Sequence, residues 1–147
     1  IATRLKHRRI SLSLETATYL QDRLQRIPEA VNIVCSRLAR EWDGRVHVLS
    51  REDVDRGILT AAQARQSRYE GVLAYFSPSE QKVLAAIARA HAVKSPSGVK
   101  FVSSTGLSQK GVSKITKKLE DEAAIHRVES GFVVSDPLLA VYLRHFR

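Results

Sequence analysis

Lysine side chains gather in one part of the sequence without an acidic neighbour. Residues 94–118 contain six lysines and no aspartate or glutamate. Ammonium groups suit phosphate oxygens, and Gln109 and Ser113 in the same stretch carry side chains able to hydrogen-bond to base edges. This combination indicates contact with a nucleic acid. The net charge of +9 over 147 residues agrees with a polyanionic partner.

Residues suited to catalysis or metal binding form no such pattern. The five histidines are scattered without a HExxH pair, and the single cysteine, Cys35, lies in an apolar-periodic stretch that predicts a buried packing role. No GxxxxGK[ST] run provides a phosphate-binding loop. We therefore predict that this chain is not an enzyme and holds no metal or cofactor. Its single cysteine fits a reducing, cytoplasmic location.

The sequence after residue 77 predicts the helices and the hairpin that position these lysines. Ser77-Pro78-Ser79-Glu80 predicts a helix start, followed by a short helix near 100–104 and a turn at Gly106. Ser108 caps a longer helix whose inward face is Val112, Ile115 and Leu119, which turns the lysines outward. Two β-prone runs, 124–128 and 132–135, flank Ser130-Gly131, and Asp136-Pro137 begins a last amphipathic helix.

This order is that of a winged helix-turn-helix domain, and the helix after Ser108 is its expected recognition helix. Arg127 on the hairpin, or wing, adds a weaker contact. The predicted DNA-binding residues are Lys100, Gln109, Lys110, Ser113, Lys114, Lys117, Lys118 and Arg127. The acidic run 120–122 would repel phosphates, so we expect contact toward the Gln109 end.

The first half also favours helices. Apolar spacing predicts helices over 14–27 and 31–42, a β-prone run over 45–49, a brief helix from Ser50 to Ile58, and another from Thr60 to Phe76. The chain is therefore expected to be mostly α-helical. We place a helical, lid-like domain at residues 1–76 and a winged-helix domain with a small β-hairpin at 77–147.

Three stretches resemble the C-terminal part of archaeal-type ATPases of the AAA+/STAND group, which have a helical lid and a winged helix. Residues 26–38 look like the lid segment in which Gly-x-Pro precedes an apolar helix, with Gln25, Arg26 and Ile27 standing where the glycine usually occurs. Residues 49–58 look like the acidic element after the lid. Residues 76–89 and 131–144 resemble the closing pattern, which runs from a β-wing into Asp-Pro-Leu-Leu.

The resemblance implies that a parent ATPase core, with its Walker motifs, ATP and Mg²⁺, precedes Ile1. This chain would then supply the lid and a DNA-binding output module. Arg26, beside Pro28, is the residue we expect to sense nucleotide from the lid.

Two alternatives remain open. In the first, the chain is a protein-interaction or oligomerisation module that uses the exposed part of residues 138–146. In the second, it is a free-standing transcription regulator. A membrane is not expected as a partner, since no apolar run spans a bilayer, although Arg4, Lys6, Arg8 and Arg9 form a second basic cluster.

Overall fold

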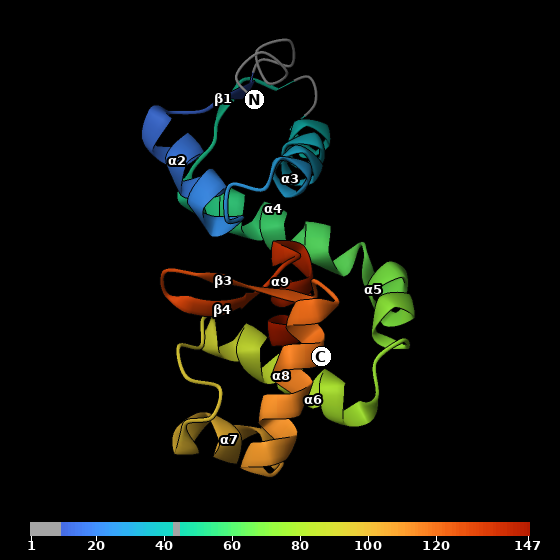
Figure 1. Cartoon of the computed structure of the whole chain (residues 1–147). Coiled ribbons are helices and arrows are strands. Elements are labelled where there is room, and N and C mark those ends of the chain that lie inside the picture. The colour runs from blue at the N-terminus through green and yellow to red at the C-terminus, as the bar shows by residue number, and fades with distance from the viewer. Residues whose placement is uncertain (1–9, 43–44) are drawn as a thin grey trace. The chain divides into compact units, whose positions relative to one another are not determined.

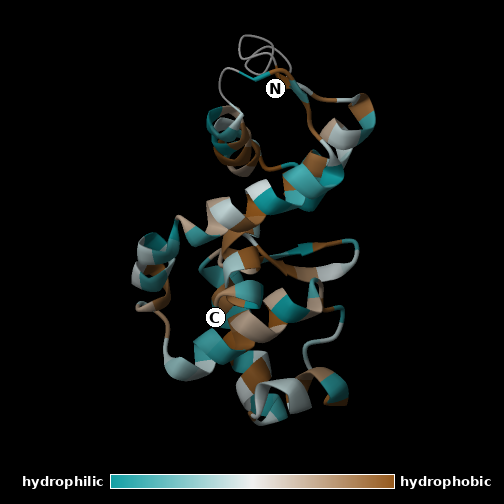
Figure 2. Ribbon diagram, turned by 180° about the vertical axis from the view of Figure 1, so that it is seen from behind, coloured by the Kyte–Doolittle hydropathy of each residue, from teal (hydrophilic) through white to brown (hydrophobic). Residues whose placement is uncertain are grey.

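The computed structural model describes residues 10–42 and 45–147, which are mostly helical as predicted (Figure 1). The basic cluster at Arg4, Lys6, Arg8 and Arg9 lies outside the described residues. Internal contacts divide the chain into two compact units, residues 1–65 and 66–147. The helical ribbons alternate hydrophobic and hydrophilic residues along their lengths, as amphipathic helices do (Figure 2). No helix in the described part of the chain has the length and apolar character that crossing a bilayer requires.

The described part of the N-terminal unit combines three helices with a minimal sheet. Its elements are β1 (Ile10–Ser11), α2 (Leu14–Arg23), α3 (Pro28–Glu41), β2 (His47–Val48) and α4 (Arg51–Gln63). The strands pair in parallel, with Ile10 opposite His47 and Ser11 opposite Val48. Ser13 caps α2 as predicted, because its hydroxyl accepts the Thr16 N–H at 3.0 Å.

A small apolar core holds these helices together. Leu20, Leu38 and Val54, from α2, α3 and α4, are fully buried. Gly57 allows α4 to approach α3 closely, because a Cβ atom at this position would lie 2.7 Å from Leu38 Cδ2. Cys35 is buried in the same core, as its spacing predicted.

The helix boundaries between residues 50 and 76 differ from the prediction. Ser50 and Asp53 form the expected capping box, but α4 then runs unbroken to Gln63. Thr60 lies inside that helix, where its hydroxyl donates to the Arg56 carbonyl at 2.9 Å, so the predicted helix start at Thr60 is wrong. A separate helix, α5 (Gln66–Leu73), follows. The contacts place α5 in the C-terminal unit, whereas the predicted division after residue 76 placed it in the other.

The C-terminal unit contains the predicted sequence of helix, short helix, turn, helix, hairpin and helix. After α5 come α6 (Pro78–Ala90), α7 (Val99–Thr105), α8 (Gln109–Asp121), β3 (Ile125–Val128), β4 (Gly131–Val134) and α9 (Pro137–His145). Ser77 and Glu80 form a capping box on α6. Asp136 caps α9 by accepting the N–H groups of Leu138 and Leu139 at 2.9 and 3.1 Å.

The hairpin gains a third partner from the loop after α6. Strands β3 and β4 pair antiparallel from Ile125–Val134 to Val128–Gly131, and Val93 bridges to Phe132 on the other side of β4. Gly131 is required at this contact: its φ is +122°, and a Cβ would lie 2.4 Å from the Val93 carbonyl carbon. The hairpin is thereby fixed to the end of α6.

The last helix belongs to the core rather than to the surface. Every residue of α9 from Pro137 to Leu143 is buried, and α9 packs against α6. The Tyr142 hydroxyl donates to Glu70 Oε1 at 2.5 Å and so ties α5 to α9. The exposed surface expected on residues 138–146 for a protein partner is therefore not offered by residues 138–143, because these side chains form the interior of the unit.

Candidate nucleic-acid interface

A tight turn sets the start of α8. Gly106 ends α7 in the left-handed conformation, with φ +67°, and Ser108 then caps α8 by accepting the Gly111 N–H at 3.1 Å. Both residues act as their sequence context predicted. The cap satisfies an N–H group of the first turn of α8, the end that the predicted interface uses.

Helix α8 has one buried face and one basic face. Val112 and Leu119 are completely buried, and Thr116 is 5% exposed. At 100° per residue, Lys110, Lys114 and Lys117 lie on the opposite side, and all three are exposed. Within the described residues, none of these three ammonium groups forms an ion pair with a carboxylate. Their charges are therefore available to an external anion.

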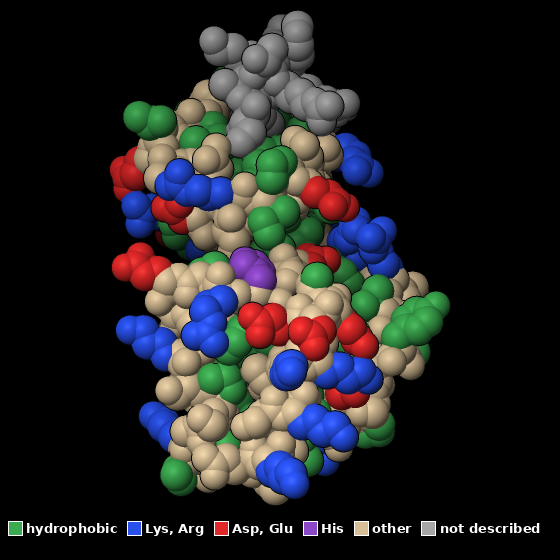
Figure 3. Space-filling view, in the orientation of Figure 1, with side chains coloured by type: hydrophobic (Ala, Val, Ile, Leu, Met, Phe, Trp, Pro, Cys, Tyr) green, Lys and Arg blue, Asp and Glu red, His purple; other side chains and the backbone are tan. Residues whose placement is uncertain are grey.

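Acidic side chains occupy the other end of the same helix. Glu120, Asp121 and Glu122 are exposed at its C-terminus. Figure 3 shows a run of Lys and Arg side chains over α8 and a group of Asp and Glu side chains where the helix ends. A phosphate backbone is attracted to the first region and repelled by the second, so the charge pattern orients the contact toward the start of α8.

Lys118 occupies a different position from the other lysines of α8. Its Nζ lies 2.6 Å from Glu80 Oε1 on α6 and 3.9 Å from Glu122 Oε1. The hydrogen bond from Lys118, together with that from the Ser77 N–H, holds the pKa of Glu80 below its ordinary value, and the same Lys118–Glu80 bond raises the pKa of Lys118. Although the sequence predicts Lys118 as a phosphate contact, the structure places it in an ion pair between the two helices.

Gln109 also makes an internal contact. Its side-chain Nε2 donates to the Ser97 carbonyl at 3.0 Å, which joins the loop before α7 to the start of α8. Ser113 remains exposed on the basic side of α8, and its hydroxyl forms no hydrogen bond within the described residues. Of the two predicted base-reading residues, Gln109 therefore uses one of its amide N–H groups to hold the loop.

Lys100 and Arg127 lie on two elements of the same unit that both contact α8. Lys100 is exposed on α7, and Arg127 is exposed on β3. The Arg127 guanidinium lies over the Phe132 ring, 4.3 Å from its centroid, which restrains the side chain without neutralising its charge.

Arg26, the predicted nucleotide-sensing residue, lies in the turn between α2 and α3. Its guanidinium pairs with Asp22 at 2.9 Å, and its side chain is 68% exposed. The backbone at Gln25 and Arg26 is left-handed, with φ of +54° and +57°. The N–H of Arg26 bonds to the Gln21 carbonyl at 2.7 Å, which closes the end of α2.

Sequence analysis missed the residues that hold α8 in place. The sequence predicts Glu80 as part of the cap of α6, and in the structure the same carboxylate also accepts a hydrogen bond from the Lys118 ammonium of α8. Ser97 contributes through its backbone carbonyl, which no side-chain pattern reveals. The available signal was the spacing of Glu80, which stands three and four residues before Val83 and Leu84 on the apolar stripe of α6, where an acidic side chain needs a partner.

A comparison with known families identifies the second unit. The family described as "Probable winged helix domain" matches residues 67–145, more than half of the chain. Comparison with curated proteins gives no match. Comparison with solved structures gives none either.

Proposed function

Because the chain belongs to the family of probable winged helix domains, we propose that it binds duplex DNA through α8. Lys110, Lys114 and Lys117 contact phosphates in this arrangement. Helices in the reading position of helix-turn-helix domains enter the major groove with their N-terminal residues against the DNA. Lys110 and Lys114 lie in that N-terminal half of α8, and Lys117 follows three residues after Lys114 on the same face.

The observation that carries this proposal is the unpaired basic face of α8. A lysine-rich helix surface is ordinarily interspersed with carboxylates that neutralise it. Here the described carboxylates nearest in sequence lie beyond Lys118, at the far end of the helix. Such a row of ammonium groups suits the phosphates of a nucleic acid, and binding of that kind depends strongly on salt concentration.

Residues on the adjoining elements would extend the contact. Lys100 on α7 and Arg127 on the wing supply further phosphate contacts, and Ser113 faces the groove beside Lys114. Lys118 acts differently: its pairing with Glu80 fixes the angle between α8 and α6, so it positions the interface. Gln109 keeps its carbonyl oxygen for a base while its N–H holds the 95–98 loop.

A paired substitution tests the proposal. Lys114→Gln with Lys117→Gln removes two charges from α8, and we expect affinity for a 20-base-pair duplex at about 0.1 M salt to fall about tenfold or more. The matched control, Arg37→Gln with Arg40→Gln, removes the same charge from exposed positions on α3. Fluorescence anisotropy would measure both variants. Equal losses in the two variants would mean that net charge alone drives binding and would contradict the proposal.

We further propose that this DNA-binding unit serves an ATP-driven parent protein of the AAA+/STAND kind, with ATP and Mg²⁺ bound by an upstream core. The support is the resemblance of residues 26–38 to a lid segment and of residues 49–58 to the element after it, together with the left-handed φ of +57° at Arg26. Arg26 stands at the glycine position of Gly-x-Pro, and glycine adopts this conformation freely. The residues encoded before Ile1 provide the test: a GxxxxGK[ST] motif supports this parentage, and a coding sequence without one contradicts it.

A further inference from the structure

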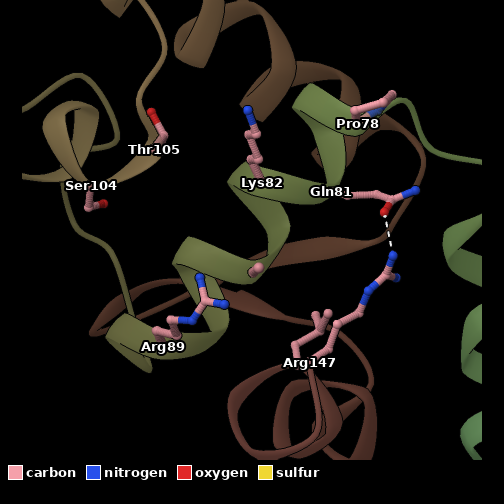
Figure 4. Close-up of a pocket in the computed structure, with 9 residues that line it drawn as sticks. Pro78, Gln81, Lys82, Arg89, Ser104, Thr105 and Arg147 are labelled. Carbon is pink, nitrogen blue, oxygen red and sulfur yellow. Dashed lines mark hydrogen bonds between the residues drawn. The ribbon is translucent and has the colours of Figure 1, made fainter.

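A second basic surface lies in a groove beside α6. The groove has a volume of about 450 Å³ and is lined by residues from α6, the end of α7 and the C-terminal end of the chain. Lys82 and Arg89 extend into it from α6, on the side of Ser104 and Thr105 (Figure 4). Among the residues that the structure describes, no acidic side chain lines it.

The two α6 cations carry free charge. Lys82 and Arg89 are both exposed, and neither forms an ion pair with a carboxylate within residues 10–42 and 45–147. Arg147, at the edge of the groove, is different. Its Nη1 lies 3.4 Å from Glu70 Oε2, and its Nη2 donates to Gln81 Oε1 at 3.0 Å. The unneutralised charge of the groove therefore comes from Lys82 and Arg89.

This groove and the basic face of α8 lie on opposite sides of α6. Glu80 points from α6 toward α8, because it bonds to Lys118. At 100° per residue, Lys82 and Arg89 lie about 200° and 180° around the helix from Glu80. The same C-terminal unit thus presents two separate basic surfaces, with α6 between them.

We propose that the Lys82–Arg89 groove binds the phosphate backbone of a second duplex, so that one C-terminal unit bridges two DNA segments. This inference rests on the proposed function of α8. Arg89 stands seven positions after Lys82, which places their Cα atoms about 10 Å apart along the helix axis at 1.5 Å per residue. Each nucleotide step advances a strand by about 3.4 Å along the duplex axis while the strand winds around that axis, so phosphates one or two steps apart lie within reach of both side chains. Lysine and arginine on one helix face can therefore contact phosphates of one strand.

A capture experiment tests the bridging. An unlabelled duplex is fixed to beads, the full chain is added, and a fluorescent duplex of the same length is supplied after washing. We expect the wild-type chain to retain the second duplex. Lys82→Glu with Arg89→Glu should reduce that capture at least tenfold while affinity for a single duplex changes by less than about threefold. The control, Arg37→Glu with Arg40→Glu, should retain capture.

The outcomes separate this inference from the function on which it rests. If the wild type fails to bind the first duplex, the proposed function itself fails. If it binds one duplex but captures no second, or if the Lys82/Arg89 variant captures as well as the wild type, the groove does not bridge DNA. An oligoglutamate peptide provides a further arm. If it binds the wild type and not the variant while no duplex is captured, the groove serves an acidic protein, and our inference is overturned.

Discussion

Ala123 occupies a backbone position that favours glycine. It follows α8 with φ +58°, and the bonds from Ala123 N–H to the Glu120 carbonyl and from Ala124 N–H to the Leu119 carbonyl, each 2.9 Å, form a Schellman ending. A side chain with a Cβ costs about 1–2 kcal/mol in this conformation. Because glycine also loses more conformational freedom on folding, the net gain from replacing Ala123 is smaller than this cost.

We therefore predict that Ala123→Gly raises the free energy of unfolding by about 0.5–1 kcal/mol. Urea unfolding followed by circular dichroism would measure the change. Ala85→Gly, in the interior of α6, is the control and should lower stability by a comparable amount. A loss of stability in Ala123→Gly would mean that the Schellman ending does not form.

Asp53 is a residue whose charge stabilises the N-terminal unit. Burial opposes its ionisation, but hydrogen bonds from the Ser50 N–H, His47, the Ser50 hydroxyl and Arg56 outweigh burial and lower the pKa of Asp53 from 3.8 to about 2. The Ser50 N–H lies 2.9 Å from Oδ2, and His47 Nε2 lies 2.8 Å from the same oxygen. Folding therefore favours the ionised carboxylate.

The lowered pKa predicts a definite pH dependence. The contribution of Asp53 is fully present above pH 4 and is lost as the pH falls from about 4 to about 2, because the unfolded chain takes up its proton first. Its size is on the order of 2 kcal/mol. Urea unfolding between pH 2 and 6 should show this loss in the wild type and a flatter curve in Asp53→Asn. Parallel curves for the two proteins would contradict the assignment.

At the scale of elements, the Glu80–Lys118 pair joins the two central helices of the winged-helix unit. Figure 1 shows α6 crossing α8, and the 2.6 Å ion pair lies at their contact. We predict that Lys118→Gln lowers stability but changes DNA affinity less than Lys114→Gln does, since the Lys114 ammonium has no carboxylate partner among the described residues.

A double-mutant cycle with Glu80→Gln separates pairing from charge. The two substitutions should couple favourably in urea unfolding, because either one breaks the same bond. Additive effects, together with a tenfold loss of DNA affinity in Lys118→Gln, would instead make Lys118 a direct phosphate contact.

The elements that could be predicted well are those whose signals come from residues close together in the sequence. Ser13, Ser77 and Ser108 cap helices through bonds to residues three positions later, and a spacing of three is visible in one dimension. The same locality misled at Thr60, because capping-box spacing also occurs in a helix interior when packing continues the helix. The bridge from Val93 to Phe132 joins residues far apart in sequence, so no local pattern predicts it.

The candidate site shows the same division between local and tertiary information. The outward direction of Lys110, Lys114 and Lys117 followed from helical periodicity, because burying Val112 and Leu119 fixes the opposite face. The pairing of Lys118 did not follow from it, since its partner is 38 residues away. The groove at Lys82 and Arg89 depends on how α7 and the chain end pack beside α6.

At the scale of the whole molecule, the net charge of +9 supplies long-range attraction but no specificity. Sequence discrimination requires groups that recognise base edges, and the basic face of α8 is mainly lysine. We therefore predict that mixed duplexes of different sequence and equal length bind with affinities within about tenfold, as phosphate contacts without bidentate base recognition allow. Competition among three unrelated duplexes would measure this range. A difference of a thousandfold would require base-reading contacts beyond those on α8.

The salt dependence of duplex binding tests the central claim most directly. If the five cations proposed on and beside α8 contact phosphates, the plot of log affinity against log salt concentration should have a slope of about −4 to −5. Replacing Lys110, Lys114 and Lys117 together by glutamine leaves Lys100 and Arg127 and should bring that slope to about −2. A triple variant that binds with the wild-type slope would show that α8 does not contact the DNA backbone.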